Sequence, residues 1–240
     1  MNVAIIGYGR MGKTIEKICL TRNHNVSVVI DIDNKDEINS LHDKNIDVAI
    51  EFTQPHSAFP NIRALIGQNI PVVCGTTAWT DKMEEIQELV QNQDGTFFYA
   101  PNYSIGVNLF FAINEYVAKL MNNFQDFDVS MEEIHHIHKL DSPSGTALNL
   151  AHDILTYNEK KTSWTNEETE KREELSIISK REPDVAGIHS IFYEGPYDKI
   201  ECTHTAKSRE GFALGSVLAA EWVHDKKGIF SMKDFLKQFL

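Results

Sequence analysis

The first residues of the chain combine a short apolar run with three closely spaced glycines. Residues 2–6 read Asn-Val-Ala-Ile-Ile, which is typical of a buried strand. Residues 7–12 follow at once with the spacing G-x-G-x-x-G, and residues 13–21 carry apolar side chains at helical intervals. In such a loop the first glycine permits a tight turn, the second lets a bound group approach the backbone, and the third lets helix and strand pack closely. We therefore expect a strand, a glycine loop and a helix whose N-terminus can hold an anion.

A glycine loop in this position typically binds the pyrophosphate of a dinucleotide. The residues expected to line the dinucleotide here are Gly7, Tyr8, Gly9, Arg10, Met11 and Gly12. Asp31 lies at the end of the next predicted strand, where a carboxylate can accept hydrogen bonds from the adenosine ribose. Ile32 and Asp33 follow it without an arginine for a 2′-phosphate, yet NADH and NADPH both remain candidates. The alternatives are a glycine turn needed only for packing and an ordinary acidic strand end.

The first hundred residues alternate between short apolar runs and helical patterns. Strands are predicted at 2–6, 26–30, 47–52, 71–74 and 96–99, and helices at 13–21, 56–67 and 81–91. Repeated alternation with nearly continuous apolar strands predicts a parallel sheet covered on both faces.

Two further loops follow strand ends in this region. They contain Gly75, Thr76 and Thr77, and then Ala100, Pro101, Asn102 and Tyr103. Ligands of open α/β sheets bind beyond the carboxyl ends of the strands, so both loops are expected to line the cofactor. The alternative is that these residues serve turn formation alone.

The pattern changes after residue 104. Helices are predicted at 108–121, 144–155 and 211–224, strands at 127–137, 175–181, 185–194 and 199–206, and an apolar tail at 232–239. The Gly-Pro turn at 195–196 joins two strands as a hairpin. We expect an α+β domain with an open, largely antiparallel sheet and helices on one face. The polar stretch 157–174 is expected to be a solvated excursion.

The densest chemistry lies in residues 132–147. His135, His136, His138 and Lys139 fall within five residues of a chain whose formal net charge is -12. A strand that continued to His138 would place His136 and His138 on one face and His135 on the other. Lys139 would then stand at the strand end as a point charge for an anion.

The next residues predict an anion site beside these cations. Pro143 ends the strand, and Ser144, Gly145 and Thr146 begin a helix whose first N–H groups, with two hydroxyls, suit a carboxylate. A neighbouring histidine could donate or accept a proton near neutral pH. A metal site is the first alternative, but no cysteine or aspartate lies at tetrahedral spacing and Lys139 would repel a cation. A polar strand end without function is the second.

Bulk properties exclude several classes of partner. The net charge of -12 argues against nucleic acid and anionic membranes, and no apolar run reaches the length of about 18 residues that crosses a bilayer. The first residues lack a basic segment and a cleavage site, so the protein is expected in the cytoplasm. Cys19, Cys74 and Cys202 form no CxxC pair and are expected to be inert thiols.

Four segments of the sequence resemble bacterial 4-hydroxy-tetrahydrodipicolinate reductase, also called dihydrodipicolinate reductase. They are Gly-Arg-Met-Gly at 9–12, Gly-Thr-Thr at 75–77, Ala-Pro-Asn-Tyr-Ser-Ile-Gly-Val-Asn at 100–108 and the block 133–148 with His-His-x-His-Lys and Pro-Ser-Gly-Thr. They occur in the family's order along nearly the whole chain. The chain departs from the family in a glycine loop one residue shorter than the common G-x-x-G-R-M-G, and in Glu51, where many members have aspartate.

The resemblance implies a Rossmann-like cofactor domain at 1–104, to which a C-terminal segment at 217–240 returns. It implies a substrate domain at 105–216 whose open mixed sheet assembles a homotetramer. By motif position, His135 resembles the general acid/base and Lys139 a second proton donor. His136, Gly145 and Thr146 are expected to hold a substrate carboxylate.

The hypothesis from the sequence is therefore an NADH- or NADPH-dependent reductase of a cyclic imine dicarboxylate in the lysine and diaminopimelate pathway. One alternative is a non-catalytic NAD(H)-binding redox sensor that signals through its oligomeric state. Another is a dehydrogenase of a different small amino or keto acid. The cluster of histidines and lysine argues against the sensor, since a sensor needs no anion pocket with proton donors.

Overall fold

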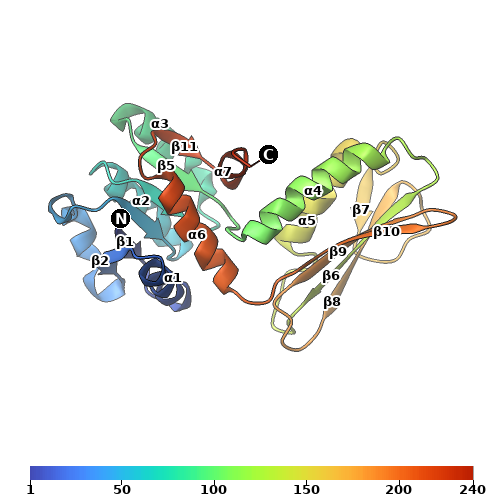
Figure 1. The fold of residues 1–240 in the computed structure, drawn as a ribbon, viewed down its shortest axis with the longest axis horizontal. Coiled ribbons are helices and arrows are strands. Elements are labelled where there is room, and N and C mark those ends of the chain that lie inside the picture. Colours follow the sequence, from blue (N-terminus) through green and yellow to red (C-terminus); the bar gives the residue numbers. More distant parts are fainter. Residues whose placement is uncertain (240) are drawn as a thin grey trace. The chain divides into compact units, whose positions relative to one another are not determined.

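The chain divides into two compact units, and a computed structural model describes residues 1–239. One unit comprises Met1–Ile105 and the segment that begins at Glu210, and the other comprises Gly106–Arg209. Figure 1 shows the course of the chain through each unit. The first unit is thus built from both ends of the sequence.

The first unit contains a six-stranded sheet with the order β11-β5-β4-β3-β1-β2. The strands are β1 (Asn2–Ile6), β2 (Asn25–Ile30), β3 (Val48–Glu51), β4 (Val72–Cys74), β5 (Thr96–Tyr99) and β11 (Gly228–Phe230). All neighbouring strands pair in parallel, which confirms the predicted parallel sheet. Every residue of β3 and β4 is buried, as expected for strands with helices on both faces.

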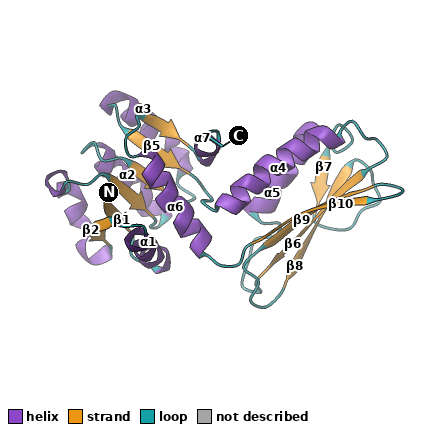
Figure 2. Cartoon of the chain, viewed as in Figure 1, coloured by secondary structure: helices purple, strands orange, loops and turns teal. Residues whose placement is uncertain are grey.

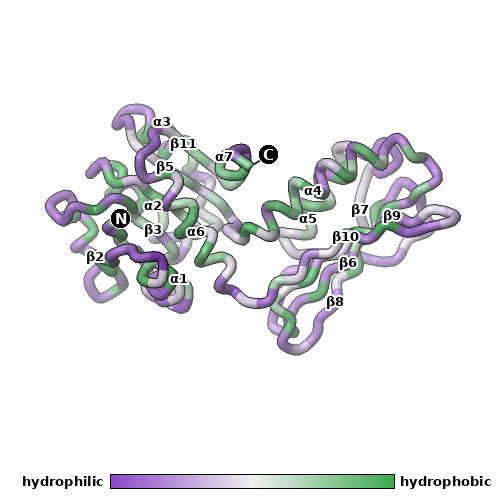
Figure 3. The backbone as a smooth tube through the Cα atoms, in the orientation of Figure 1, coloured by the Kyte–Doolittle hydropathy of each residue, from purple (hydrophilic) through white to green (hydrophobic). Residues whose placement is uncertain are grey.

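Helices cover this sheet on its two sides. They are α1 (Arg10–Thr21), α2 (Pro55–Ile66), α3 (Met83–Gln93), α6 (Glu210–Val223) and α7 (Met232–Leu236), with 3-10 segments at Ile32–Ser40, His42–Lys44 and Thr80–Lys82. Alternate residues of β1 enter different cores: Ile5 packs with residues of α1 and α6, and Ile6 with residues of α2 and α3. Figure 3 shows the apolar strands between more polar outer segments.

The C-terminal segment is more structured than an apolar tail. Gly228–Phe230 adds β11 to β5, and Ser231 caps α7 through its hydroxyl, which accepts from the N–H of Asp234. Three residues are too short a run to identify a strand by periodicity, so the sequence did not indicate β11.

The second unit holds the sheet β10-β9-β6-β8-β7. Its elements are α4 (Ile105–Met121), β6 (Asp128–His135), α5 (Gly145–Tyr157), β7 (Ser163–Thr165), β8 (Glu174–Arg181), β9 (Ile188–Glu194) and β10 (Lys199–Thr205), shown in Figure 2. The sheet is mixed, since β10–β9 and β9–β6 are antiparallel while β6–β8 and β8–β7 are parallel. The mixed sheet implied by the family resemblance is therefore confirmed, whereas the largely antiparallel sheet expected from the hairpin pattern is wrong. The chain leaves β6, passes through α5 and returns as a parallel strand, and such a crossover has no hairpin signal.

The stretch 157–174 was expected to be a solvated excursion, and most of its residues are exposed or half-buried, but its first part is attached to the sheet. It contains the edge strand β7, and Lys161 beside that strand is 4% exposed. The Lys161 ammonium lies 2.9 Å from Asp128 Oδ1 and donates to the carbonyl of Glu174 at 3.0 Å. A buried lysine with these partners fastens the excursion to the sheet.

Within residues 1–239 no helix has the length and apolar character needed to cross a membrane.

Candidate functional site

The carboxyl ends of the parallel strands of the first unit meet at one edge of its sheet. The loops that leave this edge continue the strand hydrogen bonds: Gly7 N–H donates to Ile30 O at 2.8 Å, and Gly75 N–H donates to Glu51 O at 2.9 Å. Phe52 N–H likewise donates to Ile6 O at 2.8 Å. The predicted loops at 7–12, 75–77 and 100–103 therefore begin from one rigid edge, where open α/β sheets bind ligands.

The three glycines of the first loop have different structural reasons. Gly7 has a φ of +93°, and a Cβ there would lie 2.1 Å from the carbonyl oxygen of Phe52. A Cβ on Gly12 would lie 2.1 Å from the carbonyl oxygen of Gly7, so helix and loop touch through their backbones. Gly9 has no atom within 4 Å of that position and begins α1 without a side-chain cap. The open space at Gly9 and the uncapped N–H groups of α1 fit the pyrophosphate of a dinucleotide.

The other residues predicted at this loop are placed at or near the surface. Arg10 and Asp31 are exposed, Tyr8 and Met11 are half-buried, and Tyr8 donates its hydroxyl proton to Glu16. The backbone N–H of Asp31 donates to Asn34 Oδ1 at 2.8 Å, which fixes the chain at the end of β2. Asp31 is therefore exposed to solvent, and its backbone position is fixed by this hydrogen bond.

In the second loop, some residues are packed against the protein and one is exposed to solvent. A Cβ on Gly75 would lie 2.1 Å from the ring of Phe52. Thr76 is buried and its hydroxyl accepts from the N–H of Thr53 at 2.8 Å, which ties two loops together. Thr77 is exposed, so its hydroxyl is the one available to a ligand.

The third loop has a buried and an open part as well. Ala100 and Tyr103 are buried, and the Tyr103 hydroxyl donates to Cys74 O at 2.8 Å. Pro101 is exposed and Asn102 is half-buried. Tyr103 supports the loop from behind, while Pro101 and Asn102 form its outer surface.

In the second unit β6 ends at His135, so the predicted strand through 137 was too long. The His135 carbonyl accepts the N–H of Glu182 at 2.8 Å, and the chain then turns, with the Lys139 N–H donating to His136 O at 3.1 Å. The expectation that strand alternation orients His136 and His138 is therefore wrong. Both lie in the turn, with ring centroids 6.3 Å apart.

The N-terminus of α5 follows this turn in the sequence. Some of its hydrogen-bond donors already have partners within the protein, and others do not. Ser144 is buried: its N–H donates to Glu133 Oε1 at 3.0 Å, and its hydroxyl accepts from the Ala147 N–H at 3.1 Å. Gly145 is exposed and Thr146 is half-buried. The N–H groups of these two residues, in the first turn, have no acceptor within the helix. The predicted anion donors are thus Gly145 and Thr146, while the Ser144 groups already have partners.

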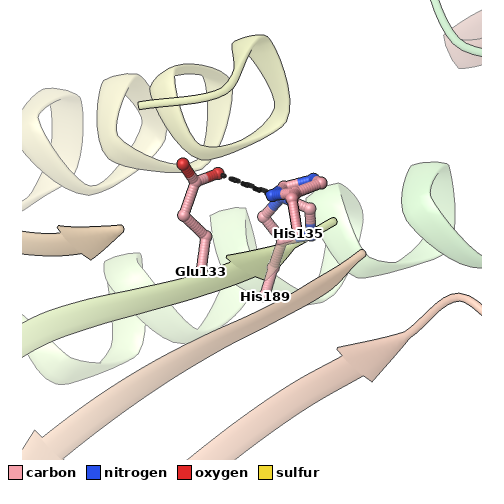
Figure 4. Close-up of side chains that lie close together, drawn as sticks. All are labelled: Glu133, His135 and His189. Atoms are coloured by element: carbon pink, nitrogen blue, oxygen red, sulfur yellow. Dashed lines mark ion pairs between the residues drawn. The ribbon is translucent and has the colours of Figure 1, made fainter. Parts of the chain in front are cut away.

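Glu133, His135 and His189 form a buried cluster at the end of β6, shown in Figure 4. Glu133 Oε2 lies 3.5 Å from His135 Nδ1 and 3.6 Å from His189 Nε2. His189 stands opposite Glu133 in the β6–β9 register, and its Nε2 is 3.1 Å from the Ser144 hydroxyl. The sequence interpretation missed Glu133 and His189. The two-residue spacing of Glu133 and His135 on one strand was the only local signal, and His189 is 54 residues beyond His135 in the chain.

Burial and charge shift the proton affinities of this cluster. Burial raises the pKa of the Glu133 carboxyl, but the nearby His189 imidazole and hydrogen bonds from Ser144 and Ser179 outweigh it and lower the pKa to about 2. Burial also lowers the pKa of the His135 imidazole, and the neighbouring His189 adds to this more than Glu133 offsets, so that the pKa is about 4. The pair is therefore a carboxylate beside a neutral imidazole at neutral pH.

Two cations accompany the cluster. The Lys139 ammonium is 2.8 Å from Asp141 Oδ1, and its side chain is 21% exposed. Arg181, which the sequence interpretation also missed, donates to the carbonyls of Asp141 at 2.6 Å and Lys139 at 3.3 Å. Its Nη1 lies 3.9 Å from Glu133 Oε1. The turn after β6 is thus held from β8 by a guanidinium.

The cluster has the side chains for three ligands to a metal ion, because Glu133, His135 and His189 each direct one atom to a common region. Its electrostatics favour a proton-sharing network instead. Donors from Ser144 and Ser179 already compensate the Glu133 charge, and Arg181 and Lys139 would repel a cation.

Comparison with protein families covers both units. Residues 1–103 match the model described as dihydrodipicolinate reductase, N-terminus, and residues 106–236 match the one described as dihydrodipicolinate reductase, C-terminus. This chain belongs to the dihydrodipicolinate reductase family.

Relatives and solved structures agree with this membership. The chain is 50% identical over 236 residues to the 4-hydroxy-tetrahydrodipicolinate reductase of Christiangramia forsetii, covering 98% of each chain. It is 35% identical to the enzyme of that name from Archaeoglobus fulgidus, over 99% of this chain and 100% of the relative. A dipicolinate-bound dihydrodipicolinate reductase from Paenisporosarcina sp. TG-14 has the same fold, with a TM-score of 0.80, 23% identity, and coverage of 100% of this chain and 99% of that one. The family is one of reductases, which makes the chain a member of an oxidoreductase family with a nicotinamide nucleotide cofactor domain.

The buried His135 makes the stability of this family member sensitive to mild acid. Its pKa falls from 6.5 to about 4 on folding, so the unfolded chain binds more protons between these values and stability decreases as the pH falls through that window. We expect the free energy of unfolding to decrease by about 2 kcal/mol more between pH 7 and pH 5 in the wild type than in His135→Asn. Urea unfolding at a series of pH values measures this.

A matched control is His152→Asn, because His152 is exposed on α5. Its pH dependence should follow the wild type. Equal pH dependence in the wild type and His135→Asn would contradict the low proton affinity of His135. Protonation of the Glu133 carboxylate decreases the free energy of unfolding further at lower pH, as the pH falls from its ordinary pKa of 4.5 to about 2.

Proposed function

We propose that the chain is a 4-hydroxy-tetrahydrodipicolinate reductase, which reduces a six-membered cyclic imine with two carboxylates to tetrahydrodipicolinate in diaminopimelate and lysine biosynthesis, in the cytoplasm. The observation that carries the proposal is the corner of the second unit. There the end of β6 at His135 and the turn with His136 and Lys139 are joined to a helix N-terminus with two free N–H groups, in a chain of net charge -12. Such a local concentration of donors suits a doubly negative ring.

The glycine loop and the two loops beside it at the sheet edge would hold the cofactor. The backbone at Gly9 and the N-terminus of α1 receive the pyrophosphate, Asp31 the adenosine ribose, and Thr77, Pro101 and Asn102 offer the accessible surface of the other two loops. When bound, reduced nicotinamide would supply a hydride to the ring carbon that is left conjugated with the imine when the 4-hydroxyl departs as water, and protonation of the resulting enamine would restore the imine. The buried Gly12, Thr76, Ala100 and Tyr103 keep these loops in place.

Different residues of the second unit would bind the substrate and transfer protons to it. The N–H groups of Gly145 and Thr146, with the imidazole of His136, receive one carboxylate. Lys139 balances the negative charge of the ring and can donate a proton as the ring nitrogen gains electrons. His135 serves as the acid/base: a dianion placed nearby favours its protonated form and so raises the pKa from about 4 when substrate binds. Proton uptake is thereby coupled to the arrival of the molecule that needs the proton.

Steady-state oxidation of NADH and NADPH with the cyclic dicarboxylate, made in a coupled reaction, tests this function. Turnover with this substrate and none with simple amino or keto acids is expected. Quenching of the protein fluorescence by NADH without any turnover would support the redox sensor instead.

Removal of either proton donor should slow the chemical step. We expect His135→Gln and Lys139→Gln to lower kcat by about 10²- to 10⁴-fold, which is the usual contribution of a positioned acid or base. The controls His152→Gln and Lys180→Gln, both on exposed side chains, should retain wild-type kcat. Wild-type turnover in either site variant, with intact circular dichroism, would refute the assigned roles.

The end of β2 favours NADH over NADPH. Asp31 is an exposed carboxylate on a fixed backbone and Asp33 is exposed nearby, so a 2′-phosphate would meet negative charge rather than an arginine. We expect kcat/KM to be higher for NADH, and Asp31→Ala to reduce the ratio of the two kcat/KM values toward one. Lys35 is a nearby cation that could attract a 2′-phosphate, and Lys35→Ala tests its effect on the same ratio. A wild-type enzyme with the higher kcat/KM for NADPH would overturn this assignment.

The second unit supports assembly into a homotetramer. One face of its sheet is covered by α4 and α5 and contains the core residues Met131, Ile177 and Ile191. The opposite face carries Ile134, Ile178 and Phe192, which are only half-buried. Apolar side chains on an uncovered sheet face suit a subunit interface. Sedimentation velocity should return four times the chain mass, and a monomer at micromolar concentration would refute the proposal.

A further inference from the structure

The catalytic imidazole proposed above has a fixed neighbour on each side. On one side, Glu133 stands two residues before His135 on β6, so both side chains point to the same face of the sheet. Glu133 Oε2 lies 3.5 Å from His135 Nδ1, and neither atom has a hydrogen-bond partner within residues 1–239. The Glu133 side chain is fully buried and that of His135 is 10% exposed. A buried carboxylate and an unpartnered ring nitrogen at this separation stabilise each other when a proton lies on Nδ1.

On the other side, the Nε2 edge of the ring faces a glycine. Gly187 has a φ of +155°, and a Cβ at that position would lie 3.2 Å from His135 Nε2. Any larger residue would press on the nitrogen that is not directed to Glu133. The backbone at Gly187 therefore leaves room beside Nε2.

The carboxylate cannot turn away from the ring, because its second oxygen is already held. Glu133 Oε1 accepts the N–H of Ser144 at 3.0 Å and lies 2.8 Å from the Ser179 hydroxyl. The two bonds come from the start of α5 and from β8. They orient Oε2 toward His135, and His189 Nε2 at 3.6 Å is the other ionisable neighbour of that oxygen among residues 1–239.

We propose that Glu133 is the positioning residue that keeps the proton of neutral His135 on Nδ1, so that Nε2 is the nitrogen that exchanges a proton with the substrate. This inference rests on the proposed reductase function and names the residue that prepares its acid/base. It is the arrangement in which a carboxylate fixes the tautomer and orientation of a catalytic histidine.

The substitution Glu133→Gln distinguishes a role in orienting His135 from a role in packing, because it keeps the size of the side chain and removes its charge. The amide oxygen of Glu133→Gln can still accept from Ser144 and Ser179, so the shape and those two bonds are kept. The amide nitrogen then faces His135 Nδ1 as a donor, which makes Nδ1 an acceptor and moves the ring proton to Nε2. The lost negative charge also lowers the proton affinity of the imidazole.

Nitrogen-15 NMR of histidine-labelled protein without substrate tests the tautomer directly. The His135 signals are assigned by their loss in His135→Gln. In the wild type we expect a protonated Nδ1 and an unprotonated Nε2 near pH 7, and in Glu133→Gln the reverse. The matched control is Glu132→Gln on the same strand, whose side chain pairs with Lys180 at 2.5 Å and which should leave the His135 signals unchanged. A wild-type His135 with its proton on Nε2 would overturn the proposal even if the variant fails to fold.

The pH dependence of kcat is a second measurement, and a purely structural role of Glu133 would not change it. We expect Glu133→Gln to lower kcat by about 10- to 100-fold, the usual effect of a residue that orients a functional histidine. The pH above which kcat declines should also shift to lower values by about one unit, because protonated His135 is the donor and has lost a stabilising charge. Unchanged pH dependence with a uniform loss of rate would assign Glu133 a structural role only.

The two readouts keep this inference distinct from the proposed function. If the wild type shows the expected tautomer but no turnover of the cyclic dicarboxylate, the function fails and the positioning stands. If the wild type turns over and His135 carries its proton on Nε2, the function stands and the positioning fails.

Discussion

The second unit depends on the compensation of one buried charge. Ionised Glu133 has no exposed surface, and an isolated carboxylate in such a place would cost several kcal/mol. This cost is offset by hydrogen-bond donors from two elements, the start of α5 and strand β8, and by the His189 imidazole of β9, whose Nε2 lies 3.6 Å from Glu133 Oε2. Because those donors converge on one side chain, the turn, helix and strands around His135 are held in one arrangement. The rigidity of the region around His135 follows from electrostatics as much as from apolar packing.

The first unit obtains its rigidity by another means, which is direct contact between backbones. Gly7 and Gly12 each leave no space for a side chain, since a Cβ would lie 2.1 Å from a carbonyl oxygen. The same holds for Gly215 of α6, where a Cβ would lie 1.7 Å from Tyr103 O. Helix and loop therefore pack without intervening side chains, and only at Gly9 does the glycine face open space. An anion of the size of a pyrophosphate can approach the backbone there.

Local charge differs in sign from the chain as a whole. The net charge of -12 repels anions at long range, whereas Lys139 and Arg181 and the start of α5 attract them at short range. Burial keeps His135 neutral until a further anion is present, so the charge of the corner responds to its ligand. An acidic protein can thus bind an acidic substrate at one place.

The sequence by itself determined the parallel sheet, the glycine loop and the helix start at Ser144, because each of these depends on residues that are close in the chain. The spacing of three glycines, the apolar runs and the proline before a Ser-Gly-Thr segment are local signals, and the structure contains all of these elements. The roles of individual residues at these positions stay predictions. The expected strand past His135 and the largely antiparallel sheet were wrong, since a turn and a crossover are decided by partners such as Arg181 and β8.

Only the tertiary structure decided which polar side chains are buried together. Glu133, His189 and Arg181 come from three strands, and their relation is set by the register of β6 with β8 and β9. A glutamate in a strand sequence is usually a solvated residue, and nothing nearby in the chain marks Glu133 as buried. Its ionised state, and the neutral state of His135 beside it, arise from the exclusion of water and the convergence of donors, which no local pattern encodes.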